Sequence, residues 1–136
     1  MIALAKRTTP NVVDSSAWLA YFADESGAAH FAAAIEAVDR LIVPAVCLLE
    51  VFKVVLRQRG EGDALQAVAL MQHGTVFDLD ATLAIAAASA GVAHKLPLAD
   101  RIVYATAQAA GAVVWTQDDD FEGLPDVEYF PRPGGK

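Results

Sequence analysis

At 136 residues, 55% of them hydrophobic and 20% charged, the chain is too apolar to be disordered and long enough to bury the core of one domain. No apolar run reaches the roughly 18–20 residues of a membrane-spanning helix, and the first residues lack the order of a secretory signal. The single cysteine, Cys47, permits no internal disulfide and fits a reducing compartment. We therefore expect a cytoplasmic protein without membrane contact, formed by one domain over 1–136 with a flexible tail at about 131–136.

The net charge of −7 weighs against non-specific affinity for nucleic acid, because such affinity depends on Lys and Arg side chains that neutralise phosphates. It does not exclude an enzyme that acts on nucleic acid. Carboxylates that surround a divalent cation add to the formal negative charge of a chain, and the bound cation offsets them.

Glycines and short β-branched runs divide the chain into alternating strands and helices. In chain order, the pattern predicts a strand at 11–14, a helix at 17–22 capped by the serines before it, a helix at 28–38, a strand at 41–43, a helix at 45–58 and a helix at 63–72. There follow a strand at 75–79, a helix at 83–93, a helix at 100–110, and strands at 112–116 and 127–130. The helix at 83–93 is almost entirely apolar, which predicts that it is well buried.

Strands that are separated by helices need crossover connections, which favour a parallel sheet. The predicted fold is therefore α/β, with three layers (α/β/α) around a central parallel sheet of four or five strands. In such sheets, functional groups gather at the carboxyl ends of the strands.

Two aspartates fall at predicted strand ends. Asp14 ends the first strand, and Asp118 follows the fourth by two residues. The two strands are neighbours if the strand order reverses between them, which would bring both carboxylates to one edge of the sheet.

Two further acids have positions that are hard to explain by solvation alone. Glu50 lies inside an apolar helical run, where an unpaired carboxylate would cost several kcal/mol to bury. Asp100 opens its helix directly after the apolar segment 96–99. Together with Asp14 and Asp118 these acids form a set of hard oxygen donors, which suits Mg²⁺ or Mn²⁺ rather than zinc.

Each acid also has a purely structural interpretation. Asp14 and Asp100 could cap helices, and the run 118–120 could be a solvated turn. Glu50 could pair with Lys53 or Arg57 on nearby turns. The set of four is more specific than any of its members.

Four stretches that contain these acids resemble the motifs of PIN domains, especially the toxin ribonucleases of VapBC toxin–antitoxin pairs. They are VVDSSAWLAYF, PAVCLLEVFKVV, LPLADRIVYATAQAAGA and VVWTQDDDFEGLP, and they follow one another in the family's order over nearly the whole chain. The resemblance implies a PIN fold and an endoribonuclease that depends on Mg²⁺, with Mn²⁺ as the alternative. It also implies a homodimer, an RNA substrate and a cognate antitoxin whose C-terminal segment occupies the active-site groove.

The resemblance carries roles onto particular residues. Asp14, Glu50, Asp100 and Asp118 are the expected catalytic and metal-binding residues, with Ser15, Thr116 and Asp120 in support. Asp119 is the alternative to Asp118, although the spacing from Thr116 favours Asp118. The number of metal ions, one or two, stays open.

Two other functions compete with this interpretation. The segment VFDLDATL resembles the motif of haloacid-dehalogenase phosphatases, with Asp78 as the nucleophile and Asp80 beside it. That motif normally opens its domain, and Ala81 stands where it usually has glycine, so we prefer a strand end followed by a helix cap at Asp80 or Thr82. A non-catalytic RNA- or protein-binding module is the second alternative, favoured by the scarcity of cations that could line a groove: Lys6, Arg7, Lys53, Arg57, Arg59, Lys95 and Arg101.

Overall fold

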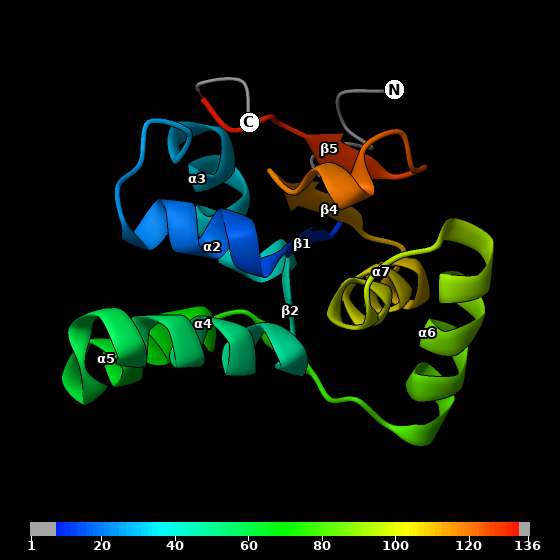
Figure 1. Cartoon of the computed structure of the whole chain (residues 1–136), viewed down its shortest axis with the longest axis horizontal. Coiled ribbons are helices and arrows are strands. Elements are labelled where there is room, and N and C mark those ends of the chain that lie inside the picture. Colours follow the sequence, from blue (N-terminus) through cyan, green and yellow to red (C-terminus); the bar gives the residue numbers. More distant parts are fainter. Residues whose placement is uncertain (1–7, 134–136) are drawn as a thin grey trace.

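The computed structural model describes residues 8–133, and its centre is a parallel sheet (Figure 1). In this part of the chain the sheet has five strands in the order β3-β2-β1-β4-β5, each parallel to its neighbours. The strands are β1 (Asn11–Val13), β2 (Leu41–Pro44), β3 (Thr75–Phe77), β4 (Val113–Thr116) and β5 (Val127–Tyr129). The predicted α/β class with a parallel sheet is confirmed, with five strands.

The strand order reverses between β1 and β4. Asn11 on the central strand pairs with Leu41 on one side and with Val113 on the other, and all three residues of β1 are buried. A strand that is covered on both faces reads as a continuous apolar run, as β1 nearly does. The neighbouring ends of β1 and β4 then bring Asp14 and Asp118 to the same edge, as the topological argument predicted.

Six α-helices cover the two faces of the sheet within the described residues. On one side lie α2 (Ser15–Phe22), α3 (Ala29–Glu36), α4 (Ala45–Arg59) and α5 (Glu61–Met71), and on the other lie α6 (Ala81–His94) and α7 (Leu98–Ala110) (Figure 1). Right-handed crossovers explain the division, because the chain steps outward from β1 to β3 and then returns over the sheet to β4. The predicted three layers are confirmed.

The core lies between the sheet and both helical layers. Its largest fully buried side chains are Trp18, Phe31, Phe121, Leu41, Met71 and Leu96. Short 3-10 turns, η1 (Val38–Arg40) and η2 (Asp119–Phe121), complete the connections, and η2 brings the aspartate run after β4 back toward the sheet edge.

The predicted burial of the helix at 83–93 is wrong. In α6 the side chains of Ile85 and Val92 are 70% and 84% exposed, and only Leu83, Ala87 and Gly91 are buried. The helix packs mainly against α7 at the margin of the fold, so only one stripe of its side chains is buried. Alanine favours helices without needing burial, and an alanine-rich run is therefore a weak sign of a core helix.

Two helix starts also differ from prediction. The cap of α2 is Asp14, whose side chain accepts a hydrogen bond from the backbone N–H of Ala17, so the helix-cap interpretation of Asp14 is confirmed and the predicted serine cap is wrong. The helix predicted from Asp100 begins at Leu98, directly behind Pro97, so that Asp100 stands within its first turn.

Some predictions fall on parts of the chain outside this description. Residues 131–133 are exposed, whereas the rest of the predicted tail, 134–136, and the cations Lys6 and Arg7 lie outside the described residues. Over residues 8–133, no single helix is long and apolar enough to cross a membrane. Only α6 and α7 taken together have that length and composition, and the two helices are bent by 109° relative to each other.

Candidate active site

The buried carboxylate of Asp14 anchors one edge of the sheet. Asp14 follows β1, is 3% exposed, and accepts hydrogen bonds on both oxygens. Its Oδ1 accepts from Ser16 Oγ at 2.8 Å and from Ala17 N at 3.1 Å, and its Oδ2 accepts from Thr116 Oγ1 at 2.9 Å. Since each carboxylate oxygen has about two acceptor positions, Oδ2 keeps one for a further ligand.

Two hydroxyl groups join the ends of β1 and β4. Thr116 Oγ1 donates to Asp14 and accepts from the backbone N–H of Asp118 at 2.9 Å, so one side chain connects the two acids. Ser16 Oγ likewise donates to Asp14 and accepts from the backbone N–H of Gln117 at 3.3 Å. Sequence reasoning missed Ser16 in this role, although the signal was present in the serine pair that follows a strand-end acid.

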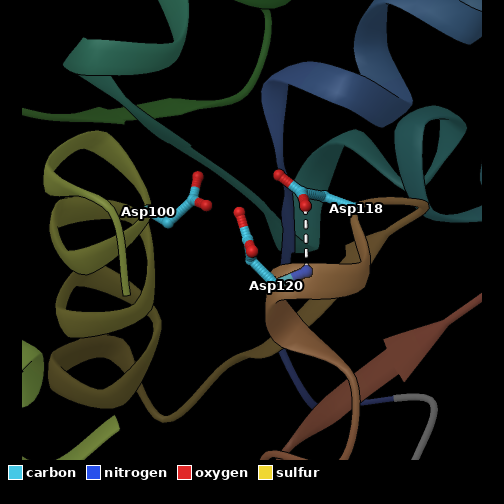
Figure 2. A group of neighbouring side chains, drawn as sticks. All are labelled: Asp100, Asp118 and Asp120. Atoms are coloured by element: carbon cyan, nitrogen blue, oxygen red, sulfur yellow. Dashed lines mark hydrogen bonds between the residues drawn. The ribbon is translucent and has the colours of Figure 1, made fainter. Parts of the chain in front are cut away.

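Three other aspartates of the site point toward one another (Figure 2). One carboxylate oxygen of Asp100, one of Asp118 and one of Asp120 lie within 4.8 Å of one another. Asp100 comes from the first turn of α7, while the other two come from the segment after β4, where Asp120 N donates to Asp118 Oδ1 at 2.9 Å. The group contains Asp118 and not Asp119, and it draws in Asp120 as well.

Glu50 approaches the same region from α4. It is half-buried, and its Oε1 accepts a hydrogen bond from Ser15 Oγ at 2.6 Å, so two of the predicted residues contact each other. The partner of Glu50 is thus Ser15 rather than Lys53 or Arg57. Glu50 stands outside the three-aspartate group but near enough for its charge to act on Asp100.

Burial and mutual repulsion oppose the ionisation of the acids at this site. Burial, followed by the charges of Asp118, Asp14, Asp120 and Glu50, raises the pKa of Asp100 to about 8. Burial also raises the pKa of Asp14 to about 6, although its three hydrogen bonds oppose the shift. The charges that act on Asp100 are all carboxylates, so nothing among them compensates the repulsion.

This donor set fits a hard divalent cation. The close ligand atoms within residues 8–133 are carboxylate oxygens, which Mg²⁺ and Mn²⁺ prefer, whereas zinc sites favour His and Cys. A divalent charge at this place would relieve the repulsion that raises the pKa of Asp100. The acidic cluster is therefore consistent with a metal site.

The segment that resembles a phosphatase motif lies elsewhere. It follows β3, which is an edge strand of the sheet. Asp80 caps α6, since its Oδ1 accepts from Leu83 N at 2.9 Å, and Asp78 is exposed. The helix-cap interpretation of Asp80 is confirmed.

Comparison with known proteins gives one family and several similar folds. The model of the PIN domain matches residues 12–127. No curated protein matches the chain.

A toxin–antitoxin complex from Klebsiella pneumoniae aligns with a TM-score of 0.74 and 21% identity, covering 89% of this chain and 98% of that one. VapC20 of Mycobacterium tuberculosis, described as a sarcin-ricin loop cleaving toxin, aligns with a TM-score of 0.71 and 22% identity over 89% and 99% of the chains. VapBC2 of Rickettsia felis, bound to a DNA fragment from its promoter, gives a TM-score of 0.70 and 11% identity over 89% and 98%.

Proposed function

The chain belongs to the PIN-domain family, and on that premise we propose that it is a metal-dependent endoribonuclease, the toxin of a type II toxin–antitoxin pair. The observation that carries the proposal is the convergence of acids from separate elements on one sheet edge. They are Asp14 after β1, Glu50 on α4, Asp100 on α7, and Asp118 with Asp120 after β4. Acids so far apart in sequence gain nothing for folding by meeting, because their repulsion and burial oppose it.

We assign the catalytic and metal-binding roles to Asp14, Glu50, Asp100 and Asp118. Mg²⁺ or Mn²⁺, when bound, supplies a water of lowered pKa and neutralises charge on the phosphate oxygens. Thr116 is a positioning residue, because its hydroxyl orients Asp14 and the turn at Asp118 together. Ser15 orients Glu50 in the same way, and Asp120 adds a third carboxylate beside Asp100 and Asp118.

Basic side chains on α4, beside the site, give an acidic chain a local surface that attracts RNA. Lys53 and Arg57 follow Glu50 by three and seven residues on α4, the spacing at which side chains share one helix face. Both are exposed. We infer that this face of α4 contacts phosphates next to the scissile bond, so that attraction is local although the net charge is negative.

An antitoxin segment is the partner that we assign to the groove between α2, α4 and α5, which none of the five acids of the site lines and which therefore differs from the active-site groove that the resemblance implies. This groove has a volume of about 470 Å³, and Leu19, Phe22 and Leu70 are among its apolar lining residues. Two arginines, Arg59 and Arg132, and two acids, Glu25 and Asp63, also line it, which suits a segment that combines apolar with charged side chains. Three similar folds come from structures described as a toxin–antitoxin complex or as VapBC, two of them with DNA.

A cleavage assay tests the proposal directly. The purified chain is incubated with a panel of structured RNAs in Mg²⁺, in Mn²⁺ and in EDTA, and we expect cleavage only with the cation. A second arm adds the product of a neighbouring small reading frame, which should stop cleavage if it is the antitoxin. Binding of RNA without cleavage in Mn²⁺ would instead support the non-catalytic module.

A homodimer is part of the proposal, and α6 offers a surface for it. Ile85 and Val92 are 70% and 84% exposed there. Exposed apolar side chains of this size are a cost to a monomer and a contact surface for a second copy. We expect light scattering to give the mass of two chains, and Val92→Glu to shift it toward one. A wild-type mass of one chain at micromolar concentration would contradict the dimer.

A further inference from the structure

Gly91 is an unusual residue for its place in α6. The helix is rich in alanine, and a glycine inside a helix costs about 1 kcal/mol relative to alanine. A Cβ atom on Gly91 would overlap the Nε, Cδ and Cζ atoms of Arg101, which crosses the helix at this point. Gly91 therefore forms a notch in α6 that admits the guanidinium group of Arg101.

The guanidinium group in this notch also closes the connection between the two helices. Arg101 Nε donates to the backbone oxygen of Leu96 at 2.6 Å, and Leu96 is itself buried with 1% exposure. The N-cap position of α7 is Pro97, which provides no side-chain hydrogen bond to the first turn. The contact from Arg101 is therefore the side-chain hydrogen bond that ties the first turn of α7 to the connection before it, although it does not satisfy the free N–H groups of that turn as a capping side chain would.

Asp100 lies next to Arg101 in the same helical turn. Successive residues of a helix point about 100° apart, so the two side chains face different neighbours. Arg101 faces α6, whereas the carboxylate of Asp100 faces Asp118 and Asp120 (Figure 2). A displacement of the first turn of α7 would therefore move Asp100 within the acidic cluster.

We propose that Arg101, seated in the notch at Gly91, is a positioning residue that fixes the first turn of α7 and with it the carboxylate of Asp100. The part of this inference that concerns cation binding rests on the proposed function. The part that concerns the order of the turn does not, and the experiment measures both.

The test compares two glycine-to-alanine variants. In Gly91→Ala the colliding atoms belong to the far end of a flexible side chain, so the substitution displaces the guanidinium group without unfolding α6. Gly62→Ala is the matched control, because Gly62 is also helical and a Cβ there meets nothing within 4 Å. Each metal-free variant is examined by hydrogen exchange over residues 98–104, and its affinity for Mn²⁺ is measured by calorimetry.

We expect Gly91→Ala to exchange faster over 98–104 and to bind Mn²⁺ roughly tenfold more weakly, a loss typical of residues that orient metal ligands. Gly62→Ala should match the wild type in both measurements. Wild-type exchange over 98–104 in a folded Gly91→Ala would overturn the inference. If the wild type bound no Mn²⁺, the proposed function would fail, and the exchange data would still decide the role of Arg101.

Arg101→Ala separates positioning from charge. The loss of a positive charge near a cation site should strengthen Mn²⁺ binding, whereas the loss of a positioning contact should weaken it. We expect roughly tenfold weaker binding, and no further loss in the double variant with Gly91→Ala, because the notch then has nothing to admit. Tighter binding in Arg101→Ala, or additive losses in the double variant, would contradict the proposal.

Discussion

Asp14→Asn and Asp100→Asn are each expected to reduce metal-dependent RNA cleavage by roughly 100- to 1,000-fold, the range for losing one electrostatic contact of a transition state. Both substitutions keep the shape of the side chain and remove its charge. In Asp14→Asn the amide oxygen would still accept from Ser16 Oγ and from the backbone N–H of Ala17, but the amide nitrogen could not bind a cation. Initial rates of RNA cleavage in Mn²⁺, with circular dichroism to verify folding, provide the measurement.

The same substitution at Asp78 is the matched control. Asp78 is exposed behind the edge strand β3, and we expect Asp78→Asn to cleave RNA as the wild type does. The phosphatase interpretation predicts instead that Asp78 forms an acyl-phosphate and that Asp78→Asn loses the enzyme's activity. Full activity in Asp14→Asn or Asp100→Asn would remove these residues from the catalytic role.

The elements of this fold could be predicted because local signals agree with the tertiary structure. Short β-branched runs mark the strands, and Gly60, Gly74 and Gly111 follow or separate the helices where the structure has their ends. The strand order could not be read in the same way. The reversal between β1 and β4 was only a condition of the argument, since pairing of distant strands leaves no periodic trace in either of them.

The burial of α6 could not be predicted for a related reason. Hydrophobic periodicity distinguishes the faces of a helix only when polar residues mark the outer one. In α6 both faces are apolar. The stripe of Leu83, Ala87 and Gly91 is buried because it packs against α7, and its composition does not distinguish it from the exposed face.

The candidate site was predictable where burial or strand position constrains a single residue. Asp14 followed from its place at a strand end, and Glu50 from the cost of an acid in an apolar run. Within the run 118–120 only the spacing from Thr116 favoured Asp118, and that spacing could not show that Asp120 lies with Asp118 beside Asp100. Ser16 and Gln117 were missed since their hydrogen bonds join residues about a hundred positions apart.

In the absence of metal, the free energy of unfolding is expected to fall as the pH rises from about 4 to about 8. Burial raises the pKa of Asp14 to about 6, and burial with four neighbouring carboxylates raises that of Asp100 to about 8, from an ordinary value of 3.8. Between these values the folded protein holds protons that the unfolded chain has released, so higher pH favours unfolding. The loss from Asp14 is on the order of 3 kcal/mol, and that from Asp100 is reduced by solvent screening. Urea unfolding in EDTA at pH 5, 6, 7 and 8 measures this fall in the free energy of unfolding.

Asp100→Asn tests the origin of this loss, because it removes the group that titrates last. We expect the variant to be more stable than the wild type at pH 8 in EDTA and to lose little stability between pH 7 and pH 8. Mn²⁺ should stabilise the wild type more at pH 8 than at pH 5, since protons and cations compete for the same carboxylates. A wild-type stability that does not change from pH 5 to pH 8 in EDTA would mean that these acids are not held together against their repulsion. If stability falls with pH as expected, the ionised carboxylate of Asp100 is required for activity and also destabilises the metal-free fold. Such a conflict is expected of a site whose charges are arranged around a cation.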